Sequence, residues 1–377
     1  MPTSLADVAQ AAGVSIATAS RVLAGSKHPV AESTRRKVLN AAARIGYQPN
    51  LIARGLRIER TYTIGIVVEN LLSPFVPPIV RGIQTRLVQD GYMGMVFSAD
   101  LDPRVEHEAV EALIRRQIDG IIFVESWLWP DTELPGGLSQ PYVFVHRPVR
   151  SSGPNSIIAD DCLGAGLAMR HLVAMGHRRI AHISGPVDWD AAQRRIRGYE
   201  DGMMDLGLPI DADLIVPGDW EVQTGYAAGQ RLAALDDPPS AIFAANDLMA
   251  VGAIYALQDA GLGVPDDVAV VGYDDREICG VTRPSVTSVR MPTHEMGYAA
   301  ADLLLRMCDG AQGVEHPVRV AGQLVIRDSC GARQGSPGFE PERGSIARAL
   351  LLSRATQIDQ LSRGGNRNAR FHEAEHT

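Results

Sequence analysis

The sequence is poor in aromatic residues and cysteine. Aromatic side chains make up 5% of its 377 residues, and it holds only four cysteines, with no Cys-x-x-Cys pair among them. Paired cysteines are the usual mark of a zinc site or a disulfide framework, so neither is expected. We predict buried, apolar roles for Cys162, Cys279, Cys308 and Cys330.

Long apolar runs are also missing. The longest, such as "TIGIVV", are far shorter than a bilayer span, and no apolar signal segment follows the first methionine. We therefore expect a cytoplasmic protein that does not contact membranes. The sequence has no G-x-S-x-G, P-loop or H-E-x-x-H motif, and "GIVVENLLSP" lacks the glycines of a dinucleotide-binding turn. These absences disfavour an enzyme, and we expect no cofactor and no metal.

Charge is divided unevenly along the chain. Residues 1–60 hold nine Lys and Arg against three Asp and Glu, a balance of +6, whereas the whole chain carries −8, which leaves −14 for the remainder. A small basic segment joined to a large acidic one is typical of a nucleic-acid-binding module attached to another domain.

Three short helices are predicted before residue 46. "LADVAQAA" follows a capping Ser4 paired with Asp7, and Gly13 separates it from a second helix capped by Ser15. "ESTRRKVLNAAARI" predicts the third helix, with Gly46 as its stop. The residues predicted to face inward from the second and third helices are Ala19, Val22, Leu23, Val38, Leu39, Ala42 and Ile45. Two short helices joined by a glycine turn and braced by a third predict a helix-turn-helix.

The second helix has an outer face that no core explains. Ile16, Ala17, Ser20 and Arg21 lie opposite the apolar side, where a helix-turn-helix meets base edges in the major groove. Ser15 and Thr18 carry short hydroxyls suited to phosphate contacts. The alternative is a solvent-facing helix in a plain three-helix bundle, which would leave an exposed isoleucine unexplained.

The segment "YQPNLIARGLR" predicts a short hinge helix after Pro49, capped by Asn50. It is too short to be stable alone, so we expect it to form when two copies meet on DNA, with Leu56 as an apolar wedge in the minor groove. We also assign Asn50 and Ala53 to the DNA contacts. The alternative is a linker that packs on the next domain.

From residue 61 onward short apolar strands alternate with helices, which predicts an α/β fold of two lobes with doubly wound parallel sheets. Strands are predicted at 63–68, 93–98, 119–124, 141–146, 155–159, 180–184, 213–217, 240–244 and 268–272. Helices are predicted at 77–90, 105–117, 162–175, 192–206, 222–235 and 247–260. The predicted domains are a DNA-binding head at 1–46, a hinge at 47–60, a two-lobed body at 61–330 and an extension at 331–377.

Polar and aromatic residues follow the predicted strands, where ligands of such folds bind. An amide, a carboxylate, a guanidinium and an indole together suit a polyhydroxylated ligand. The candidates are Asn70, Phe75, Arg195, Trp220, Asn246 and Asp274. Simpler roles stay open for three neighbours, since Asp247 could be a helix N-cap, Trp220 part of the core, and Asp275 a partner of Arg276 or Arg283.

Both parts resemble the LacI/GalR family of bacterial transcription regulators. The resemblance covers "LADVAQAAGVSIATASRVLAGS" and "TRRKVLNAAARIGYQPNLIARGLR" in the head, and "PSAIFAANDLMAVGA" and "GLGVPDDVAVVGYDD" in the body, which is similar to periplasmic binding proteins. It implies operator contacts by Ile16, Ala17, Arg21 and Leu56. In the body it implies effector contacts by Phe75, Arg195, Trp220, Asn246 and Asp274.

The resemblance also implies a homodimeric repressor that binds double-stranded operator DNA and is controlled by a small carbohydrate effector. Three residues depart from the family pattern. Ala24 replaces a usual asparagine, Ala31 a usual capping serine, and His146 a usual effector-binding aspartate, and a cationic His146 would favour an acidic sugar. The alternatives are a secreted sugar-binding protein, disfavoured by the basic head, and a sugar-binding scaffold with a vestigial head.

The extension beyond residue 330 begins with a stretch rich in glycine, proline and charge, which predicts a flexible linker. Ala347, Leu351, Ile358 and Leu361 then recur at roughly heptad spacing, although Arg354 interrupts the seam. A tetramerising helix is possible on this pattern, as in some members of the family. A disordered or transiently helical extension is the preferred interpretation.

Overall fold

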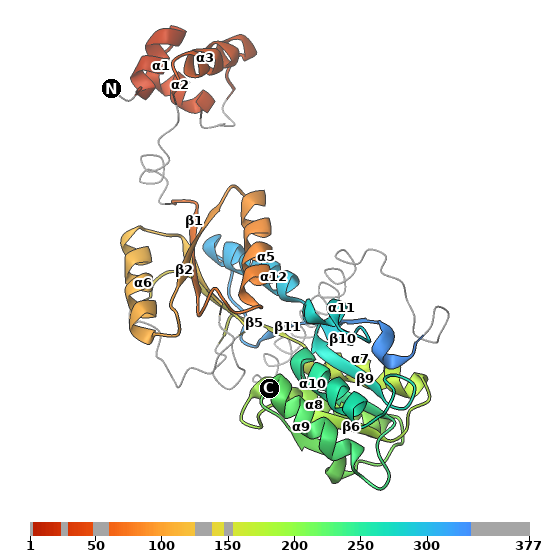
Figure 1. The fold of residues 1–377 in the computed structure, drawn as a ribbon. Helices are drawn as coiled ribbons and strands as arrows, with labels where there is room; N and C mark the ends of the chain where they lie inside the picture. Colours follow the sequence, from red (N-terminus) through yellow and green to blue (C-terminus); the bar gives the residue numbers. More distant parts are fainter. Residues whose placement is uncertain (1–2, 24–28, 48–59, 125–137, 147–153, 333–377) are drawn as a thin grey trace, which may run out of the picture. The chain divides into compact units, whose positions relative to one another are not determined.

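The computed structural model describes residues 3–23, 29–47, 60–124, 138–146 and 154–332. These residues form a small helical head and an α/β body of two lobes (Figure 1). Within the described part, no helix is both long enough and apolar enough to cross a membrane. The predicted hinge contacts Asn50, Ala53 and Leu56, the departure at Ala24 and the extension from residue 333 lie outside the described residues.

The head has the three predicted helices, α1 (Leu5–Ala12), α2 (Ile16–Leu23) and α3 (Glu32–Arg44). The Ser4 hydroxyl accepts the Asp7 amide while the Asp7 carboxylate accepts the Ser4 amide, a reciprocal cap on α1. Gly13 ends α1 at φ 66°, a conformation that costs glycine little. The hydroxyl of Ser15 accepts the amide of Thr18 at 3.1 Å and so caps α2 as predicted.

One predicted inward residue of α3 is wrong. Leu39 is 48% exposed, whereas Val38, Ala41 and Ala42 are buried. Ala41 and Ala42 lie three and four residues after Val38, on the same face, while Leu39 is turned about 100° away from it. Ala31 provides no side-chain cap for α3, as the sequence predicts for an alanine there.

The body contains two six-stranded sheets, one in each lobe. The first has the order β11-β5-β4-β3-β1-β2 and the second the order β12-β10-β9-β8-β6-β7. The strands of the first are β1 (Thr63–Val68), β2 (Met93–Ser98), β3 (Gly120–Val124), β4 (Tyr142–Val145), β5 (Ser156–Ala159) and β11 (Val318–Val320). Those of the second are β6 (Ile180–Ser184), β7 (Ile215–Pro217), β8 (Ala241–Ala244), β9 (Ala269–Asp274), β10 (Thr287–Arg290) and β12 (Gln323–Val325). β10 pairs with β9 in parallel but with β12 antiparallel.

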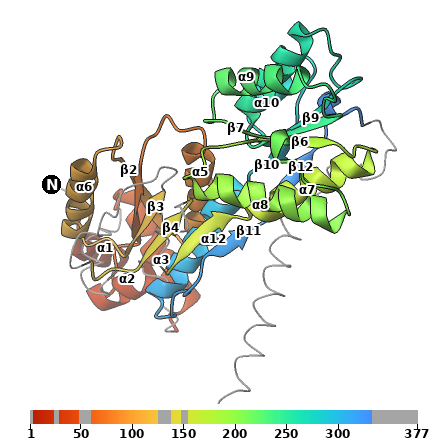
Figure 2. The same ribbon diagram turned by 90° about the horizontal axis from the view of Figure 1, so that it is seen from below.

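Helices cover both faces of each sheet, as the alternating pattern predicts. Figure 1 shows α6 on one face of the first sheet, with α5 and α12 on the other. Figure 2 shows α7 and α8 on one side of the second sheet, with α9 and α10 on the other. Their bounds are α5 (Val76–Gln89), α6 (Pro103–Arg115), α7 (Asp161–Ala174), α8 (Asp190–Asp205), α9 (Val222–Ala233), α10 (Asp247–Asp259) and α12 (Thr293–Cys308).

Neighbouring residues of the central strands belong to different cores. Ile242 and Val270 pack with α9 and α10, whereas Phe243, Val271 and Tyr273 pack with α7 and α8. Side chains alternate across a strand, so a continuous apolar run supplies both faces of the sheet at once. The runs that predicted these strands are therefore explained by burial on both sides.

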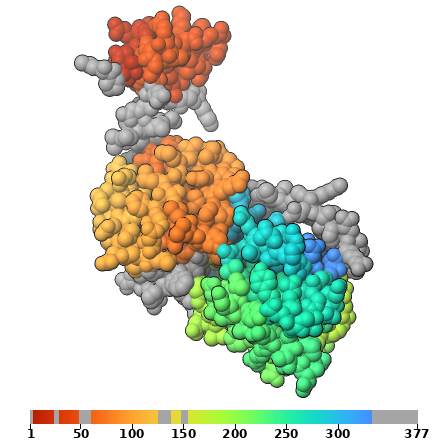
Figure 3. All heavy atoms as spheres, in the orientation of Figure 1, coloured from red at the N-terminus to blue at the C-terminus, as the bar shows by residue number. Residues whose placement is uncertain are grey.

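The chain passes between the lobes three times: after β5 into α7, after β10 into α12, and between β11 and β12. The helix α12, light blue in Figure 3, therefore joins the first lobe although it follows most of the second lobe in sequence. Its Gly297 and the facing Gly82 of α5 let the two helices approach closely, since a Cβ on either would lie 2.0 Å from a backbone oxygen of the other helix.

The sequence did not predict β10, β11, β12, α12 or the short helix α11 (Ile278–Val281). It also predicted a strand over 213–217, but residues Ala212–Leu214 form a 3-10 turn and only Ile215–Pro217 are a strand. The Asp211 carboxylate accepts the amide of Asp213, which favours the turn over an extended start.

Candidate functional site

The exposed side of α2 carries the residues predicted to contact DNA. Ile16 is 54% exposed, and Ala17 and Arg21 are exposed beside it, while Ala19 and Val22 are buried on the opposite side. Exposing an isoleucine side chain to water is unfavourable in free energy, so its position at the start of a short helix indicates that another surface covers it. The five predicted residues of this helix and its cap, Ser15, Ile16, Ala17, Thr18 and Arg21, lie together.

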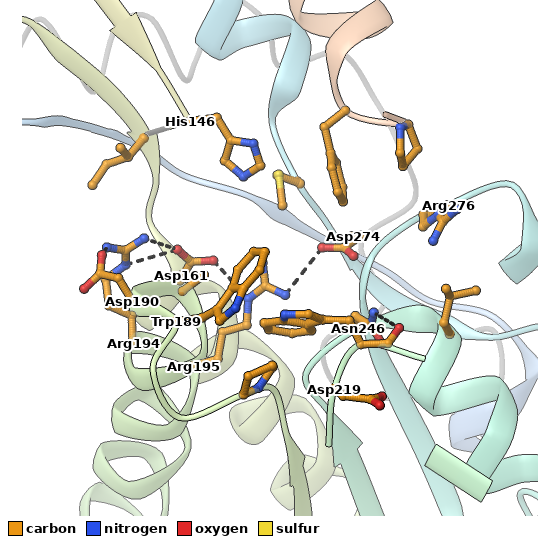
Figure 4. A pocket seen from close by; sticks show the side chains of 18 of the residues that line it. His146, Asp161, Trp189, Asp190, Arg194, Arg195, Asp219, Asn246, Asp274 and Arg276 are labelled. Atoms are coloured by element: carbon orange, nitrogen blue, oxygen red, sulfur yellow. Dashed lines mark hydrogen bonds and ion pairs between the residues drawn. The ribbon is translucent and has the colours of Figure 1, made fainter. Parts of the chain in front are cut away.

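The body contains a cavity of about 540 Å³, formed by the ends of strands and the loops after them (Figure 4). Of the seven residues predicted to contact an effector, six line it: Phe75, His146, Arg195, Trp220, Asn246 and Asp274. Asn70 does not. Its side-chain oxygen accepts the amide of Leu72 at 2.8 Å and so shapes the turn after β1.

A buried ion-pair cluster forms one wall of the cavity. The Asp161 carboxylate accepts a hydrogen bond from Nε of Arg195 at 3.0 Å and another from the Arg194 guanidinium at 2.7 Å. Arg194 also pairs with Asp190, and the Arg195 guanidinium lies 3.7 Å over the ring of Tyr273. Burial alone would raise the pKa of Asp161, but Arg195 and Arg194 outweigh it and hold that pKa below its usual value.

Sequence analysis missed Asp161, Arg194 and Tyr273. The adjacent arginines of "RRIRGY" were visible, but their carboxylate partner is 33 or 34 residues earlier in the chain. Only packing of α7 against α8 brings it to them. The cluster keeps Arg195 ionised and already paired before any ligand binds, so this arginine is positioned in advance.

Three buried polar atoms of the lining residues have no hydrogen-bond partner among the described residues. They are Nδ1 of His146, Nε1 of Trp220 and Oδ1 of Asp274. Asp274 Oδ1 lies 3.5 Å from Nη1 of Arg195, an ion pair without a hydrogen bond. Buried polar groups are nearly always paired in proteins, but each of these atoms has almost no accessible surface, so a ligand in the cavity would reach it only after the lining moves.

His146 is neutral at physiological pH, which corrects the expectation of a cationic ligand contact. Burial lowers its pKa to about 4. The negative charge of Asp161 acts in the opposite direction, but the positive charges of Arg195 and Arg194 lower the pKa further. Its ring meets Phe75 edge-to-face at 5.4 Å between centroids. A neutral imidazole offers one donor and one acceptor, which suits a hydroxyl group rather than an anion.

Asp274 is buried in the wall of the cavity, with only 5% of its side chain exposed. Burial raises its pKa to about 8, because the attraction of Arg195 does not offset the lost hydration. The carboxyl group therefore enters the folded state at a cost that a ligand with donor groups would reduce.

Two predicted capping and pairing roles are wrong. Asn246, not Asp247, caps α10: its Oδ1 accepts the amide of Met249 at 2.9 Å, and its Nδ2 donates to the backbone oxygen of Trp220 at 2.8 Å. Asn246 thus holds Trp220 in place while it lines the cavity. Asp275 pairs with Arg290 at 2.7 Å and Arg327 at 2.6 Å rather than with Arg276 or Arg283.

The backbone at the cavity is strained. His146, Trp220 and Asp274 have φ values of 65°, 78° and 105°, a region that non-glycine residues rarely adopt. Such conformations cost about 1–3 kcal/mol each and cluster at functional sites. Gly185 contributes differently, since a Cβ there would lie 2.2 Å from the Trp220 indole, so its absence makes room for that ring.

No three His, Cys, Asp or Glu side chains of the described residues gather in a way that could hold a metal ion. The cavity therefore offers hydrogen-bonding atoms, aromatic faces and paired charges as its chemistry. Such a set binds and orients a polar organic molecule.

Comparison with known proteins finds family models that match two parts of the chain. Residues 4–50 match a family model described as "Bacterial regulatory proteins, lacI family", and residues 169–330 match one described as "Periplasmic binding protein-like domain". The HTH-type transcriptional regulator RegA of Clostridium saccharobutylicum is 34% identical over 331 residues, which cover 87% of this chain and 99% of that protein.

Two solved structures are similar over nearly the same length. The lac repressor dimer bound to operator and the anti-inducer ONPF has a TM-score of 0.69 at 30% identity, covering 88% of this chain and 100% of that one. A complex of the transcriptional regulator CelR with cellobiose has a TM-score of 0.60 at 33% identity, covering 87% and 99%.

Proposed function

The chain belongs to the LacI family of bacterial transcription regulators, and we propose that it is a homodimeric repressor whose operator binding is controlled by a neutral carbohydrate in the cavity. DNA binding and transcription regulation follow from the family. The repressor role, the carbohydrate and the contacts of individual residues are the proposal. The observation that carries it is the gathering of six predicted polar and aromatic residues around one cavity at the strand ends.

A carbohydrate matches the chemistry of this lining. A hydroxyl group both donates and accepts, so it suits the carboxyl group of Asp274 and the neutral imidazole of His146, both of which line the cavity. The apolar face of a sugar ring can stack on an indole. The similar regulator CelR forms a complex with cellobiose, which supports this ligand class for a related protein.

The charges of the cavity favour a neutral ligand. Two of the three lining guanidiniums, Arg194 and Arg195, already pair with Asp161, while Asp190, Asp219 and Glu221 also line the wall. An anionic ligand would meet these carboxylates at close range in a partly desolvated space, where like charges repel strongly. We therefore propose a neutral sugar in place of the acidic sugar that a cationic His146 would have favoured.

Homodimer formation is supported by an exposed apolar surface on the first lobe. Val88 at the end of α5 is 72% exposed, and Met93 and Phe97 on the outer strand β2 are 64% and 40% exposed. Apolar side chains on the open edge of a sheet mark an interaction surface. Two heads in one dimer would bind two half-sites of a pseudo-palindromic operator.

The test has two arms with the full-length protein. The first selects duplex sequences from a random pool and measures affinity against salt, where binding should weaken steeply because each head contacts phosphates. The second measures thermal stability with neutral sugars, sugar acids, sugar phosphates and nucleosides. A ligand that binds only the native state raises the midpoint temperature of unfolding. Stabilisation by acids or phosphates alone would contradict the neutral ligand. Affinity that stays constant with salt would contradict the role of the basic head.

A further inference from the structure

The first turn of α2 presents an apolar surface to solvent. Ile16 is 54% exposed, and its neighbour Ala17 is exposed beside it. Neither side chain can donate or accept a hydrogen bond. In a helix-turn-helix the N-terminal residues of the second helix reach the base edges in the major groove. Two side chains that are placed to touch bases therefore carry no polar atom.

The hydroxyl groups at this end of the helix are already engaged. The Ser15 hydroxyl accepts the amide of Thr18 at 3.1 Å, and the two hydroxyl oxygens lie 2.9 Å apart in a second hydrogen bond. That bond uses one of their two O–H groups, so only the other is free to donate to DNA. A single donor beside the helix cap suits a phosphate oxygen, which positions the head but carries no sequence information.

Arg21 reaches a different part of the operator. It is exposed on the same helix, but it lies about 7.5 Å further along the axis than Ile16. Its guanidinium therefore contacts another base pair or a phosphate. The base nearest the first turn is left to Ile16 and Ala17.

Only thymine offers an apolar group to such a surface. In the major groove, guanine, adenine and cytosine present hydrogen-bonding atoms, whereas thymine presents a carbonyl oxygen and its C5-methyl group. An isoleucine placed against polar atoms removes water from them without replacing the lost hydrogen bonds, which is unfavourable. Placed against the thymine methyl, it buries apolar surface on both molecules. The exposed first turn therefore favours thymine over the other bases.

We propose that Ile16, with Ala17 beside it, selects a 5-methylpyrimidine at one position of each operator half-site, so that the methyl group itself is the feature recognised. This inference rests on the proposed operator binding, because it specifies which base the head reads. The charge balance of +6 over residues 1–60 and the match of residues 4–50 to the lacI family support duplex DNA as the partner of this surface. Since neither side chain forms a hydrogen bond, 5-methylcytosine should substitute for thymine at this position and uracil should not.

The experiment measures binding of the full-length protein to labelled duplexes by fluorescence anisotropy at one salt concentration. The starting duplex is the sequence selected from a random pool. Each thymine of a half-site is replaced in turn by uracil, which removes only the methyl group. The position that responds is then tested with cytosine and with 5-methylcytosine, each paired with guanine. The variants are Ile16→Ala and Ile16→Val, and Leu39→Ala is the matched control because Leu39 is a similarly exposed apolar residue, at 48%, on another helix of the head.

We expect uracil at one position to weaken binding of the parent about fourfold for each altered half-site, since one methyl group leaves an apolar contact. At that position 5-methylcytosine should restore most of the affinity that cytosine loses. Ile16→Ala should bind the thymine and uracil duplexes equally. Ile16→Val should keep part of the difference, and Leu39→Ala all of it.

An equal effect of uracil on the parent and on Ile16→Ala overturns the inference, because a change in duplex shape would act on both proteins alike. A half-site in which no thymine responds to uracil overturns it as well. Both results leave the proposed repressor standing, since the protein still binds a selected sequence. If the protein selects no sequence from the pool, the proposed operator binding fails and the inference fails with it.

Discussion

Replacing Asp274 with asparagine should remove a pH dependence of stability that the buried carboxyl group imposes. The carboxyl has a pKa of about 8 in the folded protein because burial disfavours its charged form. An unfolded aspartate has a pKa near 3.9. Between these values the folded state binds a proton that the unfolded state does not, so the stabilisation is present at low pH and is lost as pH rises toward 8.

The magnitude follows from one proton. As pH rises from well below 8, the Asp274 contribution to the free energy of unfolding should fall by up to about 1.4 kcal/mol for each pH unit. This slope should vanish above the folded pKa. Integrated from about pH 6.5 to pH 8, the loss is about 1.5 kcal/mol. Asparagine has nearly the same shape and no titration in this range, so Asp274→Asn should lack this component.

The assay is urea unfolding of the parent and of Asp274→Asn at one protein concentration, from about pH 6.5 to pH 8. The buried histidines His146 and His182 contribute a slope of opposite sign at the lower end of this window, because burial lowers their pKa values to about 4 whereas unfolded histidine has a pKa of about 6.5. This contribution is common to both proteins, so the quantity compared is the difference between their two curves. Parallel curves for the two proteins would refute the reasoning. A midpoint that collapses in Asp274→Asn at every pH would instead show that the carboxylate stabilises the fold.

Three further outcomes follow from the structure. Asp161→Asn should lower the free energy of unfolding by about 3–5 kcal/mol, since it leaves Arg194 and Arg195 without their shared buried carboxylate. The control Asp102→Asn removes only a partner of the exposed Arg104 and should change the unfolding midpoint little. Effector affinity, measured by calorimetry, should stay constant between about pH 5.5 and 6.5, because His146 with its pKa of about 4 is neutral and Asp274 with its pKa of about 8 is protonated throughout; weakening across that range would show that His146 binds as a cation. Arg21→Ala should weaken operator binding in fluorescence anisotropy and, if Arg21 contacts a phosphate, reduce the salt slope by about one; unchanged binding would remove the exposed side of α2 from the DNA contacts.

Local pattern in the sequence was enough for the head and for most elements of the body. The caps at Ser4 and Ser15 act within three residues, so the residues that form them are adjacent in the sequence. Strands such as β1 and β6 have the predicted bounds because their apolar runs are buried on both faces of a sheet. The exposed Ile16 was predicted from helical periodicity alone. The elements that were missed, β10 to β12 and α12, follow the last predicted strand, where the chain passes between the lobes.

The chemistry of the cavity depended on contacts that the sequence does not display. The partner of Arg195 is 34 residues away, and the backbone oxygen that it also contacts, that of Ala245, is 50 residues away. The low pKa of His146 and the high pKa of Asp274 arise from burial among groups of both lobes and cannot be obtained from residue type.

Asn246 illustrates the difference between the two levels. Its place after β8 was enough to predict that it lies at the cavity, because the ends of parallel strands meet at one edge of a sheet. Whether its amide binds a ligand or fixes Trp220 depends on which groups the fold brings within hydrogen-bond distance. The sequence by itself determined the elements and the edge at which the site forms, since periodicity and capping act over a few residues. Only the tertiary structure decided the charge state and partner of each side chain there, because desolvation and ion pairing depend on neighbours that are distant in the chain.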